Sequence, residues 1–471
     1  MNRHFSSLAI LMLLSACAVR GGPDLDQSTI PAAPDAWAAR PDLQVTANGP
    51  GQPSAFTQNG WVREFGDARL TDAIGEAFAN NRNLQSVLAQ LRAARAAMRV
   101  SRADLFPRID LSGSATDAEN SATVYNGELA ASWEVDIWGR NLSLARAGNA
   151  DTRAAAADYA AARQALAAAV TQAWYDRSAA GISLDLATDD LDRRKDTRRI
   201  TDARFRAGLA SRLDVRLAQV AVSNSEDRLE AAKRTARNAA RALEVLTGRY
   251  PSGDATGAND LIALNALPSL AAPVSVLAGR PDLIAAEARV DAAGLRATDA
   301  RHAMFPQLTL QFNATTQSGR IGDLFDPGTY IDAITGGLLQ PLFRGGALLA
   351  EAERQGEQAR SALFTYAQLA LTAFQEVEDR IDAEATLERQ VTATATAAEE
   401  ARTAVGLTRS RYINGRSTIF DLINAQTTAI AAETRAIEAR RARIENRVNL
   451  HLAMGDEPLP AGPLQLAAGS Q

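Results

Sequence analysis

The sequence contains almost no cysteine: among 471 residues there is one, at position 17. A disulfide framework within the chain is therefore excluded, as is a metal site built from several thiolates. Aromatic residues are also sparse, at 5% of the chain, whereas alanine and arginine are common. Such a composition suits long helices that approach closely through small side chains better than a globular core filled by large ones.

Proline is absent from two very long stretches, 108–250 and 342–457. Because a proline inside a helix costs about 3 kcal/mol, its absence permits uninterrupted helices. Residues 139–205 alone predict a helix of roughly 100 Å at about 1.5 Å per residue. A helix of that length needs partners, since a lone helix cannot bury its own apolar stripe. A bundled arrangement is therefore favoured over the alternative, an alanine-rich surface helix.

Long apolar runs and excess basic charge are missing as well. No run reaches the roughly 18 residues of a membrane-spanning helix, and the net charge is −5 without a basic tail. The sequence therefore predicts neither a helical membrane protein nor a nucleic-acid-binding protein.

No constellation of catalytic or metal-binding residues is apparent. The histidines are scattered, and the sequence has no phosphate-binding glycine loop and no nucleophile elbow. One acidic group could suggest metal binding, but a solvated helix face explains it better. This group comprises Glu376, Glu378 and Asp379. We expect no enzyme, no cofactor and no metal site.

The N-terminal residues resemble a signal for export. A short basic region precedes an apolar stretch of signal-peptide length at 5–14, which ends in LSAC at 14–17. The ending resembles a bacterial lipobox, and Cys17 would then carry several acyl chains, each methylene adding about 0.8 kcal/mol of anchoring. The alternative is a secretory signal whose cleavage site includes a cysteine. The lipobox is favoured because the only thiol stands at the acceptor position.

Four segments alternate apolar and polar residues. In VYNGELAASWEVDI, at 124–137, the odd positions are largely apolar and the even ones largely polar. A period of two predicts a strand with one apolar and one polar face. Segments that begin at Ile109 and Leu308 behave likewise, and one that begins at Tyr330 does so more weakly. Each is near the roughly 9 to 11 residues that cross a bilayer.

These strands could instead form a soluble sheet whose apolar face packs on helices. A membrane sheet is favoured by the expected acyl anchor and by aromatic residues at the strand ends, as in the interfacial girdles of membrane strands. These aromatic residues are Trp133, Trp138, Phe106, Phe305 and Phe343.

The chain carries a long internal repeat. FRAGLASRLDVRLAQ at 205–219 and YINGRSTIFDLINAQ at 412–426 share an aromatic residue, a glycine, an aspartate and an Ala-Gln pair at one constant offset. Phe-Pro pairs at 106–107 and 305–306 each close a helical stretch and open an alternating one. A period of roughly 180 residues indicates a duplicated domain rather than a solenoid.

Four strands are too few to close a barrel. Open edges in lipid leave backbone groups unpaired at several kcal/mol each, and membrane barrels have roughly eight strands or more. Copies of the chain must therefore pool their strands, and three copies would supply twelve. Their polar faces would line a wet lumen.

In combination, the lipobox, the Phe-Pro hairpins, the proline-free helices and the paired Gly-Asp-Ala-Gln segments resemble the outer-membrane efflux proteins of the TolC/OprM group. The similarity is to their lipoprotein branch, often called NodT-type, and covers residues 61–456. It implies an α+β, TolC-like fold in which very long helices form a periplasmic α-barrel. Four transmembrane strands per chain would complete a 12-stranded barrel in a homotrimer.

The resemblance also implies location and partners. The protein would sit in the outer membrane, lipid-anchored at Cys17 and extending into the periplasm. It would dock onto a periplasmic adaptor (membrane fusion) protein and an inner-membrane efflux pump, and it would export small molecules passively.

By the same resemblance, glycines form the turns at the periplasmic tips, where positive φ has no steric cost for them. The adaptor contacts would be Gly208, Leu209, Gly415 and Arg416.

Relatives narrow the pore with acidic residues two turns into the next helix. Asp421 matches one such position, and Asn424, on the same face, stands where many relatives carry a second Asp. Asp214 is the first-repeat counterpart, expected to pair with Arg212 or Arg216. A carboxylate ring would favour cationic solutes. Alternatively, these charges belong to a solvated helix face.

The expected organisation divides the chain into six parts. They are a signal peptide (1–16), an acylated segment (17–60), a first repeat (61–248), an inter-repeat linker or equatorial region (249–279), a second repeat (280–456) and a tail (457–471).

Three other functions compete with the efflux channel. The outer-membrane duct of a type I protein-secretion system would share the fold, but the lipobox and the short tail favour efflux. A periplasmic adaptor would have one helical hairpin and soluble β-domains, whereas here both hairpin types are duplicated. A hydrolase on a helical scaffold lacks its constellation.

Overall fold

The computed structural model describes residues 27–34, 36–39, 45–46, 60–117, 119, 122–267 and 270–459. Cys17 and the expected signal peptide lie outside these residues. The chain divides into two compact units, each assembled from three stretches. The first comprises Met1–Pro31, Leu88–Asp158 and Asp282–Ala370, and the second Ala32–Val87, Tyr159–Pro281 and Leu371–Gln471. Each unit therefore contains parts of both repeats.

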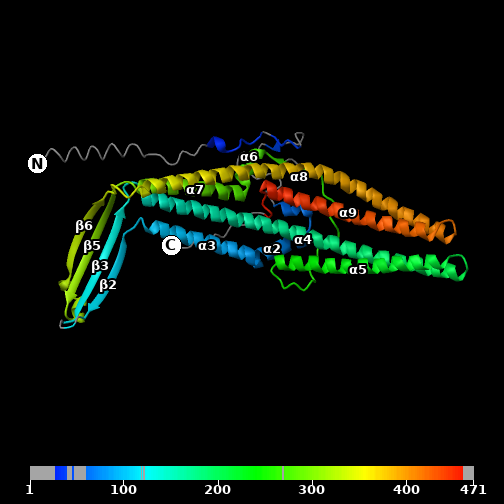
Figure 1. The fold of residues 1–471 in the computed structure, drawn as a ribbon, viewed down its shortest axis with the longest axis horizontal. Coiled ribbons are helices and arrows are strands. Elements are labelled where there is room, and N and C mark those ends of the chain that lie inside the picture. The colour runs from blue at the N-terminus through cyan, green and yellow to red at the C-terminus, as the bar shows by residue number, and fades with distance from the viewer. Residues whose placement is uncertain are drawn as a thin grey trace. The chain divides into compact units, whose positions relative to one another are not determined.

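The first unit is built around a four-stranded antiparallel sheet (Figure 1). Its strands are β2 (Arg108–Thr116), β3 (Val124–Val135), β5 (Gln307–Ser318) and β6 (Ile331–Leu339). Their order is β2-β3-β5-β6, so each repeat contributes one hairpin and the hairpins join through β3 and β5. This arrangement confirms the four strands predicted from period-two alternation.

The register gives this sheet two chemically distinct faces. Because directly paired residues point to the same side, the Leu129–Ala314 and Trp133–Leu310 pairs lie on one face with Leu111. The other face carries the paired polar residues Ser112, Glu128 and Thr315. Every residue of the edge strands β2 and β6 is exposed.

Helices of both repeats pack beside one another in the first unit. They are α3 (Arg82–Ala103), α7 (Pro281–His302) and the first parts of α4 (Arg140–Arg206) and α8 (Ala347–Ile413). Four ion pairs of alternating polarity join α4 to α7. They are Arg140–Asp299, Asp151–Arg296, Arg153–Asp291 and Asp158–Arg289. Their alternation fixes which turns of the two helices face each other.

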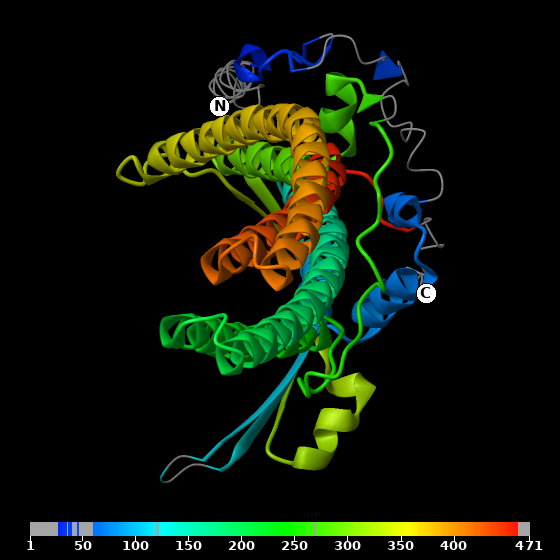
Figure 2. The same cartoon turned by 90° about the vertical axis from the view of Figure 1, so that its right-hand side faces the viewer.

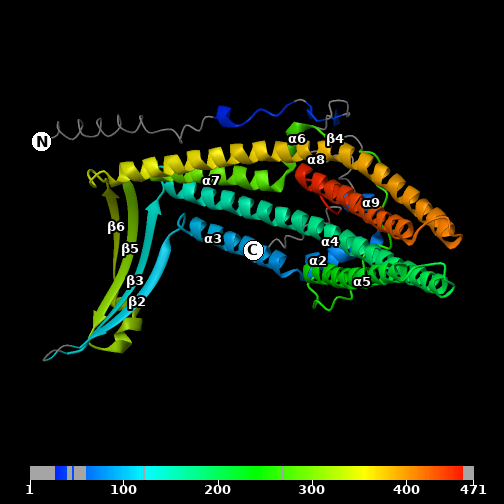
Figure 3. The same cartoon turned by 45° about the vertical axis from the view of Figure 1, so that its right-hand side comes forward.

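The second unit contains the far parts of α4 and α8, each paired with the helix that follows it. Figure 3 shows α4 side by side with α5 (Arg212–Leu246), and α8 with α9 (Ile419–Met454). Shorter elements pack on them. These are η4 (Trp61–Phe65), α2 (Ala68–Asn80), α6 (Pro273–Gly279) and the parallel pair β1 (Val45–Thr46) and β4 (Leu270–Ala271). Their core centres on Trp61, Leu70, Ile74, Trp174 and Tyr175.

The proline-free stretches form the predicted long helices. The structure has α4 over 67 residues at Arg140–Arg206, one residue from the bounds predicted for it. At about 1.5 Å per residue it is roughly 100 Å long. Its second-repeat counterpart α8 has the same length. Among the described residues, no helix is both long and apolar enough to span a bilayer.

The segment between the repeats is fastened to α5 by one side chain. The Glu244 carboxylate accepts hydrogen bonds from the backbone N–H groups of Gly253, Asp254 and Ala255, at 2.7 to 3.0 Å, and from the Ser252 hydroxyl. Residues 249–267 form no helix or strand, and these bonds satisfy backbone N–H groups that regular secondary structure would otherwise pair. They explain how an irregular segment keeps a defined course.

Candidate functional site

Each long helical hairpin of the second unit ends in the same glycine turn. Gly208, with φ 74°, ends α4, and Gly415, with φ 72°, ends α8. In both turns the next residue donates its N–H to a carbonyl five residues earlier, Leu209 to Arg204 and Arg416 to Arg411, each at 2.8 Å. This left-handed helix ending satisfies otherwise unpaired carbonyls. The predicted turns at Gly208 and Gly415 therefore have the geometry that requires glycine.

The helices that follow these turns begin with matching capping boxes. Ser211 precedes α5, and its hydroxyl accepts from the N–H of Asp214, whose carboxylate accepts from the N–H of Ser211. Thr418 and Asp421 do the same at the start of α9. Each box satisfies two backbone donors at the helix start.

One oxygen of the Asp421 carboxylate is therefore occupied by hydrogen bonds at the helix start. Its Oδ2 accepts from the Thr418 N–H at 2.9 Å, the Thr418 hydroxyl at 2.8 Å and the Ser417 hydroxyl at 3.1 Å. These hydrogen bonds, the backbone one foremost, hold the pKa of Asp421 below its usual 3.8. The group therefore stays charged at neutral pH. Asn424 is exposed one turn further along α9.

Asp214 does not form the expected ion pair. Its carboxylate bonds the Ser211 N–H at 2.7 Å, and neither Arg212 nor Arg216 approaches it within ion-pair distance in the described chain. Asp214 is the third residue of α5, so the capping geometry aims its side chain back at the helix start. The two arginines, two positions away on either side, project to other faces of the helix.

The tips themselves are open to solvent. Leu209 is 66% exposed, and Gly415 and Arg416 are exposed as well. Two large apolar residues of the first turns, Leu213 and Phe420, are exposed beside them. In a single chain these apolar side chains lack a partner, which is typical of surfaces that bind another protein.

Sequence reasoning missed the bonds that join the two hairpins just behind the tips. The Tyr412 hydroxyl lies 2.9 Å from the Thr201 hydroxyl, and the Gln426 amide donates to Thr197 at 3.0 Å. The Arg204 guanidinium stacks 5.0 Å from the Tyr412 ring centre and donates to the Ile413 carbonyl at 2.9 Å. Tyr412 and Gln426 belong to the repeated motif, so the pattern marked these residues without indicating their partners.

A buried ionic cluster lies at the other end of α9. His451, which is far from the other histidines in the sequence, stacks on Trp61 with 5.4 Å between the ring centres. Its two ring nitrogens each lie 2.8 Å from a carboxylate, of Glu64 and of Asp456. Burial alone would lower the pKa of His451, but these bonds raise it above 6.5.

The neighbouring charges complete this cluster. Glu384 accepts from Arg447 at 2.7 Å, Arg443 at 3.0 Å and the Asn446 amide at 3.1 Å, and Arg447 also pairs with Glu64. Burial tends to raise the pKa of Glu64, but the bond from His451 and the charge of Arg447 leave it lowered. The cluster ties α8, α9 and η4 together, and balanced pairing makes it structural.

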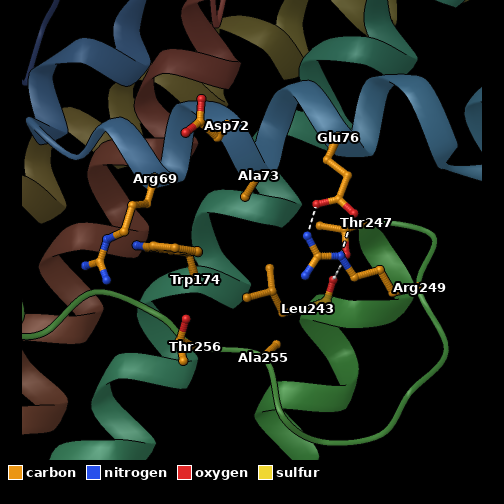
Figure 4. Close-up of a pocket in the computed structure, with 10 residues that line it drawn as sticks. All are labelled: Arg69, Asp72, Ala73, Glu76, Trp174, Leu243, Thr247, Arg249, Ala255 and Thr256. Carbon is orange, nitrogen blue, oxygen red and sulfur yellow. Dashed lines mark hydrogen bonds and ion pairs between the residues drawn. The ribbon is translucent and has the colours of Figure 1, made fainter.

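A small polar hollow opens on α2, α4 and the end of α5. Figure 4 shows Glu76 bonded to Arg249 on one side and Arg69 beside Trp174 on the other. The Arg69 guanidinium lies 5.7 Å from the Trp174 ring centre. Glu76 is paired with Arg249, and Arg69 with Asp67 at 3.5 Å, so these charged groups of the hollow already have partners within the chain.

The acidic group on α8 is also engaged. Glu376 pairs with Arg280 at 2.6 Å. The Glu378 carboxylate accepts from the N–H groups of Ala38 and Ala39, both at 2.7 Å. Within the described residues, no group of three or more histidine, cysteine or acidic side chains could hold a metal ion.

Comparison with known proteins identifies the family. The model of outer membrane efflux proteins matches residues 73–249 and 272–456. This chain belongs to the outer membrane efflux protein family. It is therefore an outer-membrane channel of efflux pumps and not an enzyme, as the sequence predicted.

Three relatives of this outer membrane efflux protein illustrate the similarity. OpmQ of Pseudomonas aeruginosa, a pyoverdine export outer membrane protein, is 29% identical over 471 residues, 96% of each chain. TtgC of Pseudomonas putida, a toluene efflux pump outer membrane protein, is 28% identical over 477 residues, 97% of this chain and 96% of its own. The open-state MtrE channel of Neisseria gonorrhoeae superposes with a TM-score of 0.78 at 26% identity, over 92% of this chain and 99% of its own. The predicted TolC-like fold is confirmed.

Proposed function

We propose that this efflux protein works as a homotrimer whose sheets close into one twelve-stranded barrel in the outer membrane. One observation carries the proposal: the four-stranded sheet is two-faced, and both edge strands are exposed along their whole length. An open sheet with an apolar face can be stable in a bilayer only when its edges are paired.

The strand order supports head-to-tail closure. Because all neighbouring strands are antiparallel and their number is even, β6 of one copy can pair antiparallel with β2 of the next without breaking the alternation. Three copies would then place residues such as Leu111 toward lipid and residues such as Ser112 toward the lumen.

The helix tips are the proposed contacts with a periplasmic adaptor. Leu209 and Arg416 offer an apolar and a basic surface in equivalent turns, beside Gly208 and Gly415. An inner-membrane pump behind the adaptor would supply the energy, in line with relatives of this family that are named as outer membrane proteins of efflux pumps.

We assign the periplasmic constriction to Asp421, with Asn424 beside it and Asp214 as the first-repeat counterpart. Two observations support this: Asp421 is exposed and its pKa is lowered. A ring of three such carboxylates would raise the local concentration of cations. Asp214 is half-buried, which makes its contribution smaller.

The proposed cargo is a set of small molecules, in line with the names of OpmQ and TtgC, which refer to pyoverdine and toluene. Acylation of Cys17 would add an anchor to the strands. Labelled palmitate should enter the wild-type protein and should not enter a Cys17→Ala variant.

The decisive experiment is to solubilise the full chain from outer membranes, measure the mass of the complex and test its ion conductance in planar bilayers. We expect three chains per particle and a conducting pore. A stable single subunit, soluble without detergent after the Cys17→Ala change, would refute the proposal. Export of an unfolded polypeptide rather than small molecules would favour the type I secretion duct.

A further inference from the structure

The connection between β5 and β6 is a compact structure of its own. Residues 319–330 contain two short helices, η5 (Ile321–Phe325) and η6 (Pro327–Thr329). The Tyr330 hydroxyl donates to the Leu324 carbonyl at 2.7 Å, and the Thr329 hydroxyl donates to the Asp323 carbonyl at 2.9 Å. Asp326 caps η6 by accepting from the Gly328 N–H at 3.0 Å. Its backbone is therefore held in one conformation.

This connection lies on the apolar face of the sheet. Gly127 shares that face with Leu129, because residues two apart on a strand point to the same side. A Cβ placed on Gly127 would lie 3.5 Å from Leu324 Cδ2 and 3.6 Å from the Tyr330 hydroxyl. Leu324 and Tyr330 therefore cover Gly127 from the apolar side.

Two residues of β5 confirm this position. Thr316 and Ser318 pair with Gly127 and Tyr125, so they belong to the same face. The Thr316 hydroxyl bonds Thr329 at 3.0 Å, and the Ser318 hydroxyl bonds Asp323 at 2.5 Å. Thr316 is only 4% exposed as a result. Figure 2 shows the two short helices, in yellow-green, beside the strands.

The connection presents two large apolar side chains outward, next to the exposed Arg320. Phe325 is 84% exposed and Ile321 61% exposed, although the loop has folded enough to bury Thr316. The polar groups Asp323 and Asp326 are turned to bonds within the loop instead.

The connection between β2 and β3 provides a contrast within the same sheet. Its sequence, DAENSAT at 117–123, contains no large apolar residue. Exposed apolar side chains are therefore particular to the β5–β6 connection and are not a general feature of how the strands are joined.

We propose that residues 319–330 form a membrane-interface anchor, in which Ile321 and Phe325 contact the lipid surface beside the apolar face of the sheet. This inference rests on the proposed function, because it requires that face to meet lipid. We infer that lipid contacts Ile321 and Phe325, because the loop continues an apolar face that also carries the exposed Leu111 and Ile334. Aromatic residues at the polar boundary of membrane strands act in the same way.

The test uses nitroxide labels on single introduced cysteines in the full chain reconstituted into lipid vesicles. The labelled positions are Phe325→Cys and Ile321→Cys in the loop, Leu111→Cys on the apolar face and Ser112→Cys on the polar face. Wild-type protein carried through the same labelling provides the blank for Cys17. Each label is exposed to oxygen, which concentrates in lipid, and to a nickel chelate, which stays in water.

We expect the ratio of oxygen to nickel accessibility at 321 and 325 to match that at 111 and to exceed that at 112. If position 111 is lipid-exposed but 321 and 325 respond to nickel, the loop inference is refuted and the barrel stands. If neither reagent reaches 321 and 325, a neighbouring copy covers them, which also overturns the inference. If 111 itself responds to nickel, the proposed membrane sheet fails. Because Phe325 and Ile321 are exposed, their replacement removes no internal packing.

Discussion

Replacing Glu384 with glutamine should destabilise the second unit far more than the same change one helical turn away. Glu384 is 3% exposed and accepts bonds from Arg443 and Arg447, the latter 1% exposed. Removing one partner of a buried pair costs about 3 to 5 kcal/mol, because the other charge is left uncompensated. Arg447 keeps its pairing with Glu64, which places the expected loss near the lower limit, about 3 kcal/mol.

Glu388 provides a matched control for this change. It also pairs with Arg443, at 3.1 Å, but it is 53% exposed. Exposed ion pairs contribute about 0 to 1 kcal/mol, so Glu388→Gln should lower the free energy of unfolding by no more than that. Both glutamates pair with Arg443, but only Glu384 is buried and also bonds Arg447 and Asn446, so the comparison sets the buried cluster against one exposed pair.

The assay is guanidinium unfolding in one detergent at one protein concentration, because assembly couples stability to concentration. A double-mutant cycle of Glu384→Gln with Arg447→Met should show coupling of about 1 kcal/mol or more. Additive losses, or a Glu384→Gln loss no larger than that of Glu388→Gln, would contradict the assignment of the cluster as a buried tie.

Three further outcomes follow from the structure. In the folded protein the pKa of His451 is raised above 6.5, so its contribution to the free energy of unfolding is complete below pH 6.5 and is lost as the pH rises. The pKa of Glu64 is lowered below 4.5, so its contribution is complete above pH 4.5 and is lost as the pH falls. Unfolding free energy should therefore decline towards pH 9 in wild type and less so in His451→Gln, as measured by unfolding at each pH. Asp421→Asn should lower the preference of the channel for cations with the helix start intact, because it removes the charge without changing the size of the side chain. Asp421→Ala should also increase leakage of bulky solutes and lose the hydrogen bonds to Thr418, about 0.5 to 1.5 kcal/mol. Equal cation selectivity in bilayers for wild type and Asp421→Asn would argue against the constriction. Tyr412→Phe should cost about 0.5 to 1.5 kcal/mol by removing the bond to Thr201, and should increase hydrogen exchange near the tips; unchanged exchange would count against that link.

Local patterns predicted most of the elements. The absence of proline set the length of α4 and α8, and the period of two located β2, β3 and β5. The glycine turns were predicted from the family resemblance, and the tolerance of glycine for positive φ is the physical reason for its place there. These features depend on neighbouring residues alone, so a single sequence contains the information.

Contacts between distant residues could not be predicted in this way. Glu64 and His451 are separated by 387 positions, and no periodicity links them. The capping role of Asp214 and Asp421 could have been predicted from Ser211 and Thr418, which stand three residues earlier as in a capping box. A side chain can serve both the cap and the pore, since Asp421 uses one carboxylate oxygen for the cap.

The two repeats keep the same helix endings but differ in what joins them. Phe205 occupies the position of Tyr412 and has no hydroxyl, and Gln219, the counterpart of Gln426, bonds Ser223 on its own helix at 3.4 Å. At these two motif positions, only the second-repeat residues therefore form a side-chain hydrogen bond to the other hairpin. In a ring of three copies, contacts between hairpins of one chain would then differ chemically from contacts between chains. The ring of six hairpins would have three-fold rather than six-fold chemistry, although all six tips share one backbone geometry.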